Sequence, residues 1–307
     1  MRIGITTSSH GRLLRSPEIH FTCEQSMEAF RQGGFDVVCM DFYEYCEPGQ
    51  PMRDAGWEDW CFRQKEAADR IGVEVLYAHA PFYDEHAKKT DGDGLYEELV
   101  RRSVRGAGIM GAKQMVFHPC SVSDGAWYSR RESLERNAGQ YRRYAEMCAG
   151  YGITVCMENM IEPSVGRRFG SSAEELLELY DLLGKGYGIC WDFGHAHMSG
   201  VRQCAALEQL GSRLTMLHVN DNFGKADSHL TPYFGTIRWD EIMKTLQKTG
   251  YRGDLLFENF GFFDGLPEQL RVPALSFCHR LGEYMVGLKE AETEAVPGRD
   301  TGETRKA

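Results

Sequence analysis

Short apolar runs rich in β-branched residues recur along the chain and predict β-strands. They occupy residues 2–7, 35–42, 73–80, 113–119, 153–159, 187–193, 214–220 and 255–259. Between them lie segments whose apolar residues are three and four positions apart, which is typical of helices with one buried face. The predicted helices cover residues 22–34, 57–72, 95–112, 130–152 and 171–184. Strands and helices therefore alternate along the chain.

Local signals at the helix ends support this alternation. Ser171 or Ser172, with Glu174 or Glu175 three positions later, forms a capping-box pattern before a helix that ends at Gly184. Near-continuous apolar strands that alternate with helices are typical of a parallel sheet covered by helices. Because eight strands are predicted, we expect a closed (β/α)₈ TIM barrel of the α/β class, with a doubly wound open sheet as the alternative.

The barrel is expected to form a single domain over residues 1–288. Residues 289–307 have almost no large apolar side chains, so they are predicted to be a disordered polar tail. The formal net charge of the chain is −10. The tail has four basic and five acidic side chains, so it contributes little of that charge. An acidic body argues against nucleic acid and membranes as partners.

Composition and cysteine usage bear on the compartment. The chain is 42% hydrophobic and 26% charged, which is ordinary for a soluble globular protein. No apolar run approaches the roughly 18 residues of a membrane span, and the N-terminus does not read as a secretory signal. The ten cysteines are scattered without a C-x-x-C pair, which favours reduced thiols. We therefore predict a cytoplasmic protein.

Metal-competent side chains end six consecutive predicted strands. In a barrel of this kind the carboxyl ends of the strands form the face that carries the chemistry. The residues are His79, His118, Glu158, Asp192, His218 and Glu258, with His195 just beyond Asp192. One such residue is more often an ordinary hydrogen-bonded group, but six strands that deliver them to one rim indicate a shared site.

The last four of these strands are neighbours in a barrel wall, so their terminal side chains should converge. They supply Glu158, Asp192, His218 and Glu258. Three carboxylates and one imidazole form a hard, anionic site that favours Mn²⁺, with Mg²⁺, Co²⁺ and Zn²⁺ as alternatives. A hydrogen-bonded core network is the other interpretation of Asp192.

A second polar cluster lies in the loop after the seventh strand. Asp227 and His229 have the spacing D-x-H and are expected to point back toward His79 and His118, as a second metal site or as substrate contacts. An ordinary polar surface loop is the alternative. His195 should contact substrate or a second ion. His197, two positions further on in a turn that begins a helix, should face elsewhere.

The strand-end motifs read E-N, D-x-x-H, H-V-x-D, D-x-H and F-E in chain order. This combination resembles the xylose-isomerase-like TIM barrel superfamily over nearly the whole chain. That superfamily includes sugar phosphate isomerases and epimerases, inosose dehydratases and endonuclease-IV-type apurinic-site nucleases.

The resemblance implies two kinds of metal site. In the epimerases, the residues that match Glu158, Asp192, His218 and Glu258 bind one divalent metal, and the two glutamates also move protons. In the nucleases, a trinuclear zinc cluster is held by the residues that match His79, His118, Glu158, Asp192, His195, His218, Asp227, His229 and Glu258.

The predicted rim loops argue for a small polyhydroxylated substrate. A nuclease needs Lys/Arg-rich loops to neutralise phosphates, whereas here only Arg167 and Arg168 are well placed for an anion. Aromatic side chains on the rim could stack on a sugar or a polyphenol, with core packing or loop anchoring as the alternative. These are Trp57, Trp127, Tyr128 and Trp191. The expected substrate-binding residues are His79, His118, Trp127, Arg167 and His195.

One loop departs from the family pattern. Many relatives read D-x-H-x-x-P-G-x-G where this chain has D-S-H-L-T-P-Y-F-G, so Tyr233 and Phe234 make the loop bulkier and more apolar. The same fold also includes C-deglycosylases, which cleave a carbon–carbon bond between a sugar and a flavonoid and require a partner subunit. That branch stays open.

These observations predict a divalent-metal-dependent sugar or polyol isomerase or epimerase. Glu158 and Glu258 would serve as base and acid, moving a proton through a metal-stabilised enediolate. The alternatives are a C-deglycosylase-type or dehydratase lyase, an endonuclease-IV-like phosphodiesterase, and a catalytically silent metal-binding subunit. The chain could also form a homo-oligomer or bind a partner subunit.

Overall fold

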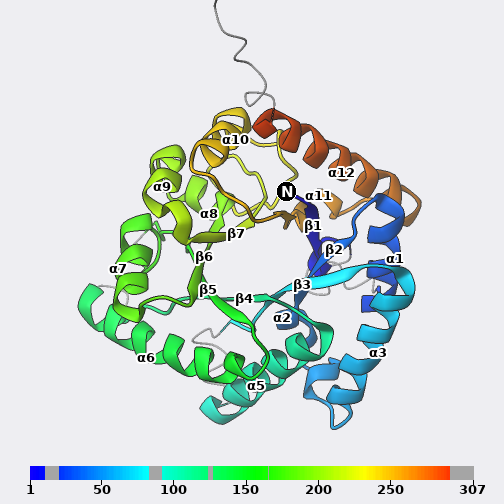
Figure 1. The fold of residues 1–307 in the computed structure, drawn as a ribbon, viewed down its shortest axis with the longest axis horizontal. Coiled ribbons are helices and arrows are strands. Elements are labelled where there is room, and N and C mark those ends of the chain that lie inside the picture. Colours follow the sequence, from blue (N-terminus) through cyan, green and yellow to red (C-terminus); the bar gives the residue numbers. More distant parts are fainter. Residues whose placement is uncertain (11–20, 83–91, 124–126, 165, 291–307) are drawn as a thin grey trace, which may run out of the picture.

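Eight parallel strands form a barrel that helices surround (Figure 1). The computed structural model describes residues 1–10, 21–82, 92–123, 127–164 and 166–290. From residue 291 on, the predicted polar tail lies outside the described residues. The single-domain barrel architecture expected from the alternating pattern is confirmed.

The strands follow one another around the barrel in chain order. They are β1 (Ile3–Thr6), β2 (Val37–Asp41), β3 (Glu74–His79), β4 (Gln114–Phe117), β5 (Thr154–Glu158), β6 (Tyr187–Asp192), β7 (Leu214–His218) and β8 (Leu255–Phe257). β8 pairs with β1. The wall closes between β7 and β8 through an isolated parallel bridge from Val219 to Phe257, where the Glu258 N–H donates to the Val219 carbonyl at 3.1 Å.

Helices form the outer layer between successive strands (Figure 1). The longer ones are α1 (Cys23–Gly33), α3 (Trp57–Ile71), α5 (Gly92–Met110), α6 (Arg130–Ala149), α7 (Ala173–Leu183), α9 (Gln203–Leu210), α10 (Trp239–Lys248) and α12 (Glu268–Glu290). Short helical turns are η1 (Thr7–Ser9), α2 (Phe42–Tyr45), η2 (Pro51–Arg53), α8 (Phe193–Met198), η3 (Gly211–Arg213) and α11 (Phe260–Phe263). The five helices predicted from spacing correspond to α1, α3, α5, α6 and α7.

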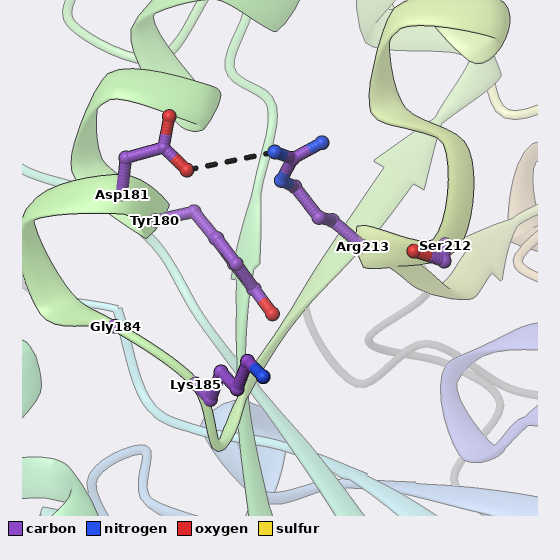
Figure 2. Close-up of a pocket in the computed structure, with 6 residues that line it drawn as sticks. All are labelled: Tyr180, Asp181, Gly184, Lys185, Ser212 and Arg213. Atoms are coloured by element: carbon purple, nitrogen blue, oxygen red, sulfur yellow. Dashed lines mark ion pairs between the residues drawn. The ribbon is translucent and has the colours of Figure 1, made fainter.

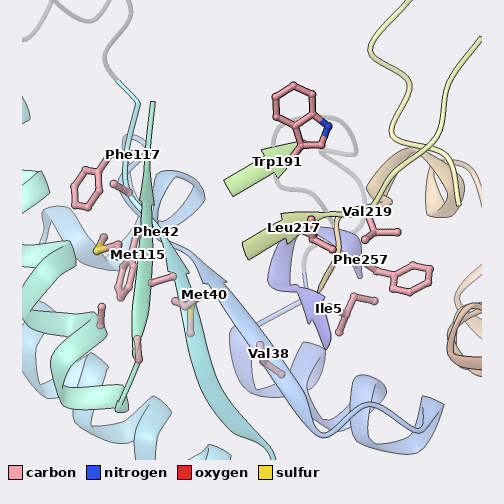
Figure 3. Packing of buried hydrophobic residues seen from close by; sticks show 14 of the residues in the cluster. Ile5, Val38, Met40, Phe42, Met115, Phe117, Trp191, Leu217, Val219 and Phe257 are labelled. Carbon is pink, nitrogen blue, oxygen red and sulfur yellow. The ribbon is translucent and has the colours of Figure 1, made fainter. Parts of the chain in front are cut away.

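Buried apolar side chains pack on both sides of the strands. The barrel interior holds Val37, Cys39, Tyr77, Val116, Cys156, Cys190, Met216 and Leu256. Alternate strand positions, such as Val38 and Met40, instead pack outward against the helices (Figure 3). Since successive strand residues point to opposite faces, burial on both faces produces the near-continuous apolar runs of the sequence.

At the N-termini of two helices, side chains accept hydrogen bonds from the first backbone N–H groups. Thr22 and Gln25 form a complete capping box before α1. The box predicted before α7 is only half present. The Ser172 hydroxyl accepts from the Glu175 N–H at 3.4 Å, but the Glu175 carboxylate accepts from the Gly170 N–H at 2.8 Å instead of closing the box.

All ten cysteines are free thiols, and eight of them are buried. Burial raises the pKa of the Cys23 thiol to about 12, so it stays protonated at neutral pH. Among the described helices, none is both long and apolar enough to cross a membrane.

Replacing Thr22 by Ala is expected to lower the free energy of unfolding by about 1 kcal/mol, because α1 loses the side-chain acceptor for the Gln25 amide. Denaturant unfolding followed by circular dichroism measures this change. Thr22→Ser keeps an acceptor and is the matched control. An equal loss in both variants would show that the cap is not the cause.

Candidate metal centre

The metal-competent side chains predicted at the strand ends gather at the carboxyl end of the barrel. They form three groups, and within each group the potential ligand atoms lie within 4.8 Å of one another. The groups are His79–His118–Glu158, Glu158–Asp192–His218–Glu258 and His195–Asp227–His229. All nine residues therefore come together, and Glu158 belongs to two groups.

The four-residue group is buried and centres on His218. Its Nδ1 lies 2.9 Å from Glu158 Oε1, 3.2 Å from Glu258 Oε2 and 4.0 Å from Asp192 Oδ2. Asp192 and His218 are 0% exposed. Three carboxylates that face one imidazole nitrogen in a buried place need protons or a cation to balance their charge.

Hydrogen bonds hold Asp192 in position. The Asn220 Nδ2 donates to its Oδ2 at 2.7 Å, and the His195 backbone N–H donates to its Oδ1 at 2.6 Å. The Asn159 side chain accepts from the Asp192 N–H at 2.6 Å and donates to the Asp192 carbonyl at 2.9 Å. Gly194 leaves room for this network, because a Cβ there would lie 1.9 Å from Asn220 Oδ1. The network and ligand interpretations of Asp192 are therefore compatible.

Glu158 also faces the imidazoles that follow β3 and β4. Its Oε2 lies 3.3 Å from His79 Nε2 and 3.1 Å from His118 Nε2. The His79 Nδ1 is 2.7 Å from the Ala80 carbonyl, which places the proton of the neutral ring on Nδ1 and the lone pair on Nε2. This group can hold a metal ion or a substrate oxygen.

Asp227 and His229 return to the site from the loop after β7. His229 Nε2 lies 3.1 Å from Asp227 Oδ2, and His229 Nδ1 donates to the Glu258 carbonyl at 2.8 Å. The pair faces His195, whose Nε2 is 3.8 Å from Asp227 Oδ2. The sequence suggested that it would point back toward the imidazoles after β3 and β4, and the imidazole that shares a group of potential ligands with it is that of His195. The contact of His195 Nδ1 with the Asn159 carbonyl, 2.8 Å, directs the His195 Nε2 toward this loop.

His197 points away from these groups. Its Nε2 contacts the Thr236 hydroxyl at 2.8 Å, and it belongs to none of the three groups of potential ligands found among the described residues. This agrees with the expectation that two positions along a helical turn face different sides.

Asp221, which the sequence reading did not single out, organises the loop that carries Asp227 and His229. Its carboxylate is fully buried. It accepts hydrogen bonds from the backbone N–H groups of Asn222, Tyr233 and Ile237 and from Trp239 Nε1, at 2.8 to 3.1 Å. The H-V-x-D motif contained this residue, but only the fold shows how many donors it gathers.

The loop is also strained. His229 and Tyr233 have φ values of 43° and 71°, in the left-handed region that side chains other than glycine seldom adopt. Each such residue costs on the order of 1–3 kcal/mol unless its surroundings enforce it. The Asp221 hydrogen bonds enforce it here, because the Tyr233 N–H is one of the donors.

In the metal-free protein, the pKa values of the two glutamates of the four-residue group are shifted in opposite directions. Burial alone would raise the pKa of Glu158, but the imidazoles of His218 and His118 lower it well below its usual range. Burial raises the pKa of Glu258 to about 8, against the opposing effect of His218.

The imidazoles divide in a similar way. Burial opposes a charge on His218, yet Cys190, Glu158 and Glu258 raise its pKa well above the usual range. Burial lowers the pKa of His118 to about 4, so this ring is neutral at pH 7 and available as a ligand.

The four-residue group fits a divalent cation. Glu158 Oε2 is buried, and its neighbours among the described residues are the His79 and His118 ring nitrogens at 3.3 and 3.1 Å, neither of which makes a well-aligned hydrogen bond to it. An ion or a substrate group could complete this oxygen. Carboxylate oxygens with one imidazole suit Mn²⁺, Mg²⁺ or Zn²⁺. A cation in the other two groups would have imidazole-rich ligands.

The predicted substrate-binding side chains outside these groups differ in how freely they could reach a ligand. Trp127 is 50% exposed. Arg167 is exposed but already pairs with Glu162, with Nε 2.6 Å from Oε1. Trp191 is fully buried in the core and Tyr128 donates to Glu175 at 3.0 Å, so these two act in packing and loop anchoring.

A separate pocket lies at the other end of the wall, where β6 and β7 begin (Figure 2). Asp181 and Arg213 form an ion pair across it at 3.7 Å, and the Arg213 guanidinium lies over the Tyr180 ring. Its lining residues include one carboxylate and no imidazole or thiol. The pocket therefore lacks the ligand set found at the carboxyl ends of the strands.

Comparison with known proteins places the chain among barrels of one family. A family model described as xylose isomerase-like TIM barrel matches residues 27–272. An uncharacterized protein of Methanocaldococcus jannaschii is 31% identical over 244 residues, which cover 75% of this chain and 77% of that protein. A protein of Acholeplasma laidlawii named probable endonuclease 4 is 24% identical over 203 residues, covering 59% of this chain and 66% of its own.

Solved structures with the same fold include sugar epimerases. A D-tagatose 3-epimerase-like protein has a TM-score of 0.71 at 24% identity and covers 95% of this chain and all of its own. D-psicose 3-epimerase, solved in the presence of D-fructose, has a TM-score of 0.70 at 13% identity, with coverages of 94% and 100%. The IOLI protein, solved with a bound zinc atom, has a TM-score of 0.70 at 14% identity, with coverages of 96% and 100%.

Metal binding is expected to tighten as the pH rises toward 8. In the metal-free protein His218 and Glu258 both hold a proton at pH 7, because the pKa of His218 is raised and that of Glu258 is about 8. A cation must displace these protons, so its apparent affinity should increase about tenfold per pH unit for each proton released. Calorimetry with Mn²⁺ in two buffers of different ionisation enthalpy counts the protons. Binding without proton release would contradict this electrostatic description.

Asp192→Asn should lower the affinity for Mn²⁺ at least about tenfold, because the site loses one of its anionic ligands. His197→Ala is the matched control and should bind as the parent does, because His197 contacts Thr236 and belongs to none of the groups of potential ligands. Equilibrium dialysis with elemental analysis measures both. An Asp192→Asn protein with parental affinity would show that the ligand assignment is misplaced.

Proposed function

Since the chain belongs to the xylose isomerase-like TIM barrel family, we propose that it is a divalent-metal-dependent isomerase or epimerase of a sugar or polyol. The observation that carries this proposal is the buried group Glu158–Asp192–His218–Glu258, which combines a hard metal site with two glutamates. Epimerases among the solved structures with this fold support the same class of reaction.

The reaction would be the transfer of a proton at a carbon next to a carbonyl. When bound by the four residues, a divalent cation supplies Lewis-acid polarisation of the substrate's oxygens. One glutamate removes the C–H proton to leave an enediolate, and the other returns a proton to the same carbon or to its neighbour. Return to the same carbon inverts its configuration, and return to the neighbour moves the carbonyl.

Glu158 and Glu258 are the residues proposed for these steps. Both are buried, at 1% and 5% exposure, so water competes little for the transferred proton. Their environments push their proton affinities apart, which is typical of an acid and base pair. Glu158, whose pKa the neighbouring imidazoles lower, would act as the base, and Glu258 would return the proton.

Neighbouring imidazoles would orient the substrate. His195 Nε2 and His118 Nε2 both lie at the edge of the group, within 3.8 Å of a carboxylate oxygen of Asp227 or Glu158. The neutral His118 ring can donate to or accept from substrate hydroxyls. Burial opposes a charge on His195, yet Asp192, Glu158 and Asp227 raise its pKa, so this ring would act as a donor. Half-exposed Trp127 is a candidate for stacking on the apolar face of a sugar ring.

Glu158→Gln is expected to lower kcat about 10²–10⁴-fold, because an amide cannot accept the proton. The amide keeps the size of the side chain, so the fold should be retained. Glu66→Gln on α3 is the matched control, since Glu66 is exposed and should leave turnover unchanged. Activity is first located with a panel of ketoses, keto-sugars and inososes in the presence of Mn²⁺. Full activity in the chelated protein would refute the metal-dependent mechanism.

A second candidate is metal-assisted hydrolysis of a phosphodiester. Two observations favour it: three groups of potential metal ligands occur at the same end of the barrel, and the chain is similar to a protein named probable endonuclease 4. The net charge of −10 and the pairing of Arg167 with Glu162 argue against a DNA-binding rim. Elemental analysis combined with activity assays separates the two candidates. One ion per chain with turnover of a sugar supports the isomerase, whereas three ions per chain with cleavage of apurinic DNA support the hydrolase.

A further inference from the structure

Helix α12 has an apolar stripe beside the face that packs on the barrel, and part of this stripe is exposed. It lies on the outside of the molecule between α10 and α1 (Figure 1). One face buries Arg271, Leu275, Cys278 and Met285. A neighbouring stripe repeats every three or four positions and consists of Leu270, Ala274, Phe277, Leu281, Tyr284 and Leu288.

This stripe is exposed at three positions seven residues apart. Leu270 is 52% exposed, Phe277 43% and Tyr284 53%. A surface helix of a monomer normally places polar residues here. Spacing of three and four positions over nearly the whole helix is instead typical of a seam that packs against another helix.

Aromatic residues from two other segments extend the stripe. Phe234 contacts Phe277 with ring centroids 5.9 Å apart, and Phe262 contacts both of them at 5.1 Å and 6.4 Å. Tyr233 lies 6.0 Å from Tyr284. Scattered exposed apolar residues are ordinary, but rings from α12, α11 and the β7–α10 loop that touch one another form one continuous patch.

We propose that this patch, the α12 seam with Tyr233, Phe234 and Phe262, is the contact surface between two copies of the chain. The two α12 helices would pack against each other about a twofold axis, so that each seam covers the other. Twofold dimers are the commonest homo-oligomers, and their contact surfaces are self-complementary.

The chain's own C-terminal residues are a poor alternative occupant. They follow directly after α12, but residues 291–307 contain one Val, one Pro and no larger apolar side chain. Such a segment could not bury enough apolar surface to compensate for the entropy of ordering it.

The exposed area suits a pair of identical surfaces. A fully covered aromatic side chain buries about 200 Å², so each half-exposed large side chain offers about 100 Å². Tyr233, Phe234, Leu270, Phe277 and Tyr284 are 40% to 53% exposed. Two copies of these five would bury on the order of 1,000 Å², which is near the lower bound for a specific interface.

The charges beside the seam are compatible with self-association despite the acidic body. Arg280 and Glu283, both exposed, lie between Phe277 and Tyr284 in the sequence of α12. In an antiparallel pair, a basic position on one helix can face an acidic position on the other. The patch itself adds no charge, so the repulsion of two chains of net charge −10 is not concentrated at the contact.

Sedimentation equilibrium of the full-length protein tests the proposal. The expected mass is about twice 34.8 kDa at micromolar concentration. The double variant Phe277→Glu, Tyr284→Glu places two charges per copy in the contact and should weaken dimerisation at least about 100-fold. Both positions are half exposed, so the monomer should stay folded, which its melting temperature and circular dichroism show.

Phe62→Glu on α3 is the matched control, because Phe62 is 50% exposed but lies outside the patch. This variant should remain dimeric. A wild-type mass of one chain at all concentrations, as expected if another protein or the chain's own C-terminal residues cover the patch, would overturn the proposal. A dimer that persists in the double variant would overturn it as well. The wild-type mass is decisive even if a variant misfolds.

Discussion

The Glu158 carboxylate is the group around which the rest of the site is arranged. It is 1% exposed, and a buried carboxylate without a positive partner would cost several kcal/mol. Its Oε1 faces His218 and its Oε2 faces His79 and His118, at 2.9 to 3.3 Å. Side chains from β3, β4 and β7 therefore all converge on one charge. A cation at this place would balance the charge of the carboxylates, and the imidazoles would no longer be needed as their positive partners.

The loop after β7 shows how much of the fold supports this arrangement. Asp227 and His229 reach the site only because Asp221 gathers donors from the loop and from Trp239. The course of this loop requires left-handed backbone conformations at His229 and Tyr233, which are strained. Strain of this kind persists only where the surroundings determine the backbone conformation, as the hydrogen bonds to Asp221 do for Tyr233.

The sequence predicted the barrel well, because a strand that is buried on both faces consists of a nearly continuous run of apolar residues. The side chain at each strand end was equally readable, since Glu158, Asp192 and His218 are the last residues of their strands. The conformation of the loop that carries Asp227 and His229 could not be predicted, because it depends on the hydrogen bonds that Asp221 accepts from Tyr233, Ile237 and Trp239. Periodicity does not encode such hydrogen bonds. The same is true of Trp191, which resembles a rim residue in sequence but is fully buried.

The barrel closes at the strands that carry the candidate ligands. Most neighbouring strands pair through a ladder, but β7 and β8 meet in an isolated bridge at Val219 and Phe257. The adjacent residues along these two strands are His218 and Glu258, whose Nδ1 and Oε2 lie 3.2 Å apart. A cation bound by both side chains would join β7 to β8 where the backbone joins them least. Binding energy at the site is then also folding energy of the barrel, because the unfolded chain does not bring these ligands together. The proposed chemistry and the closure of the wall would then depend on the same pair of residues.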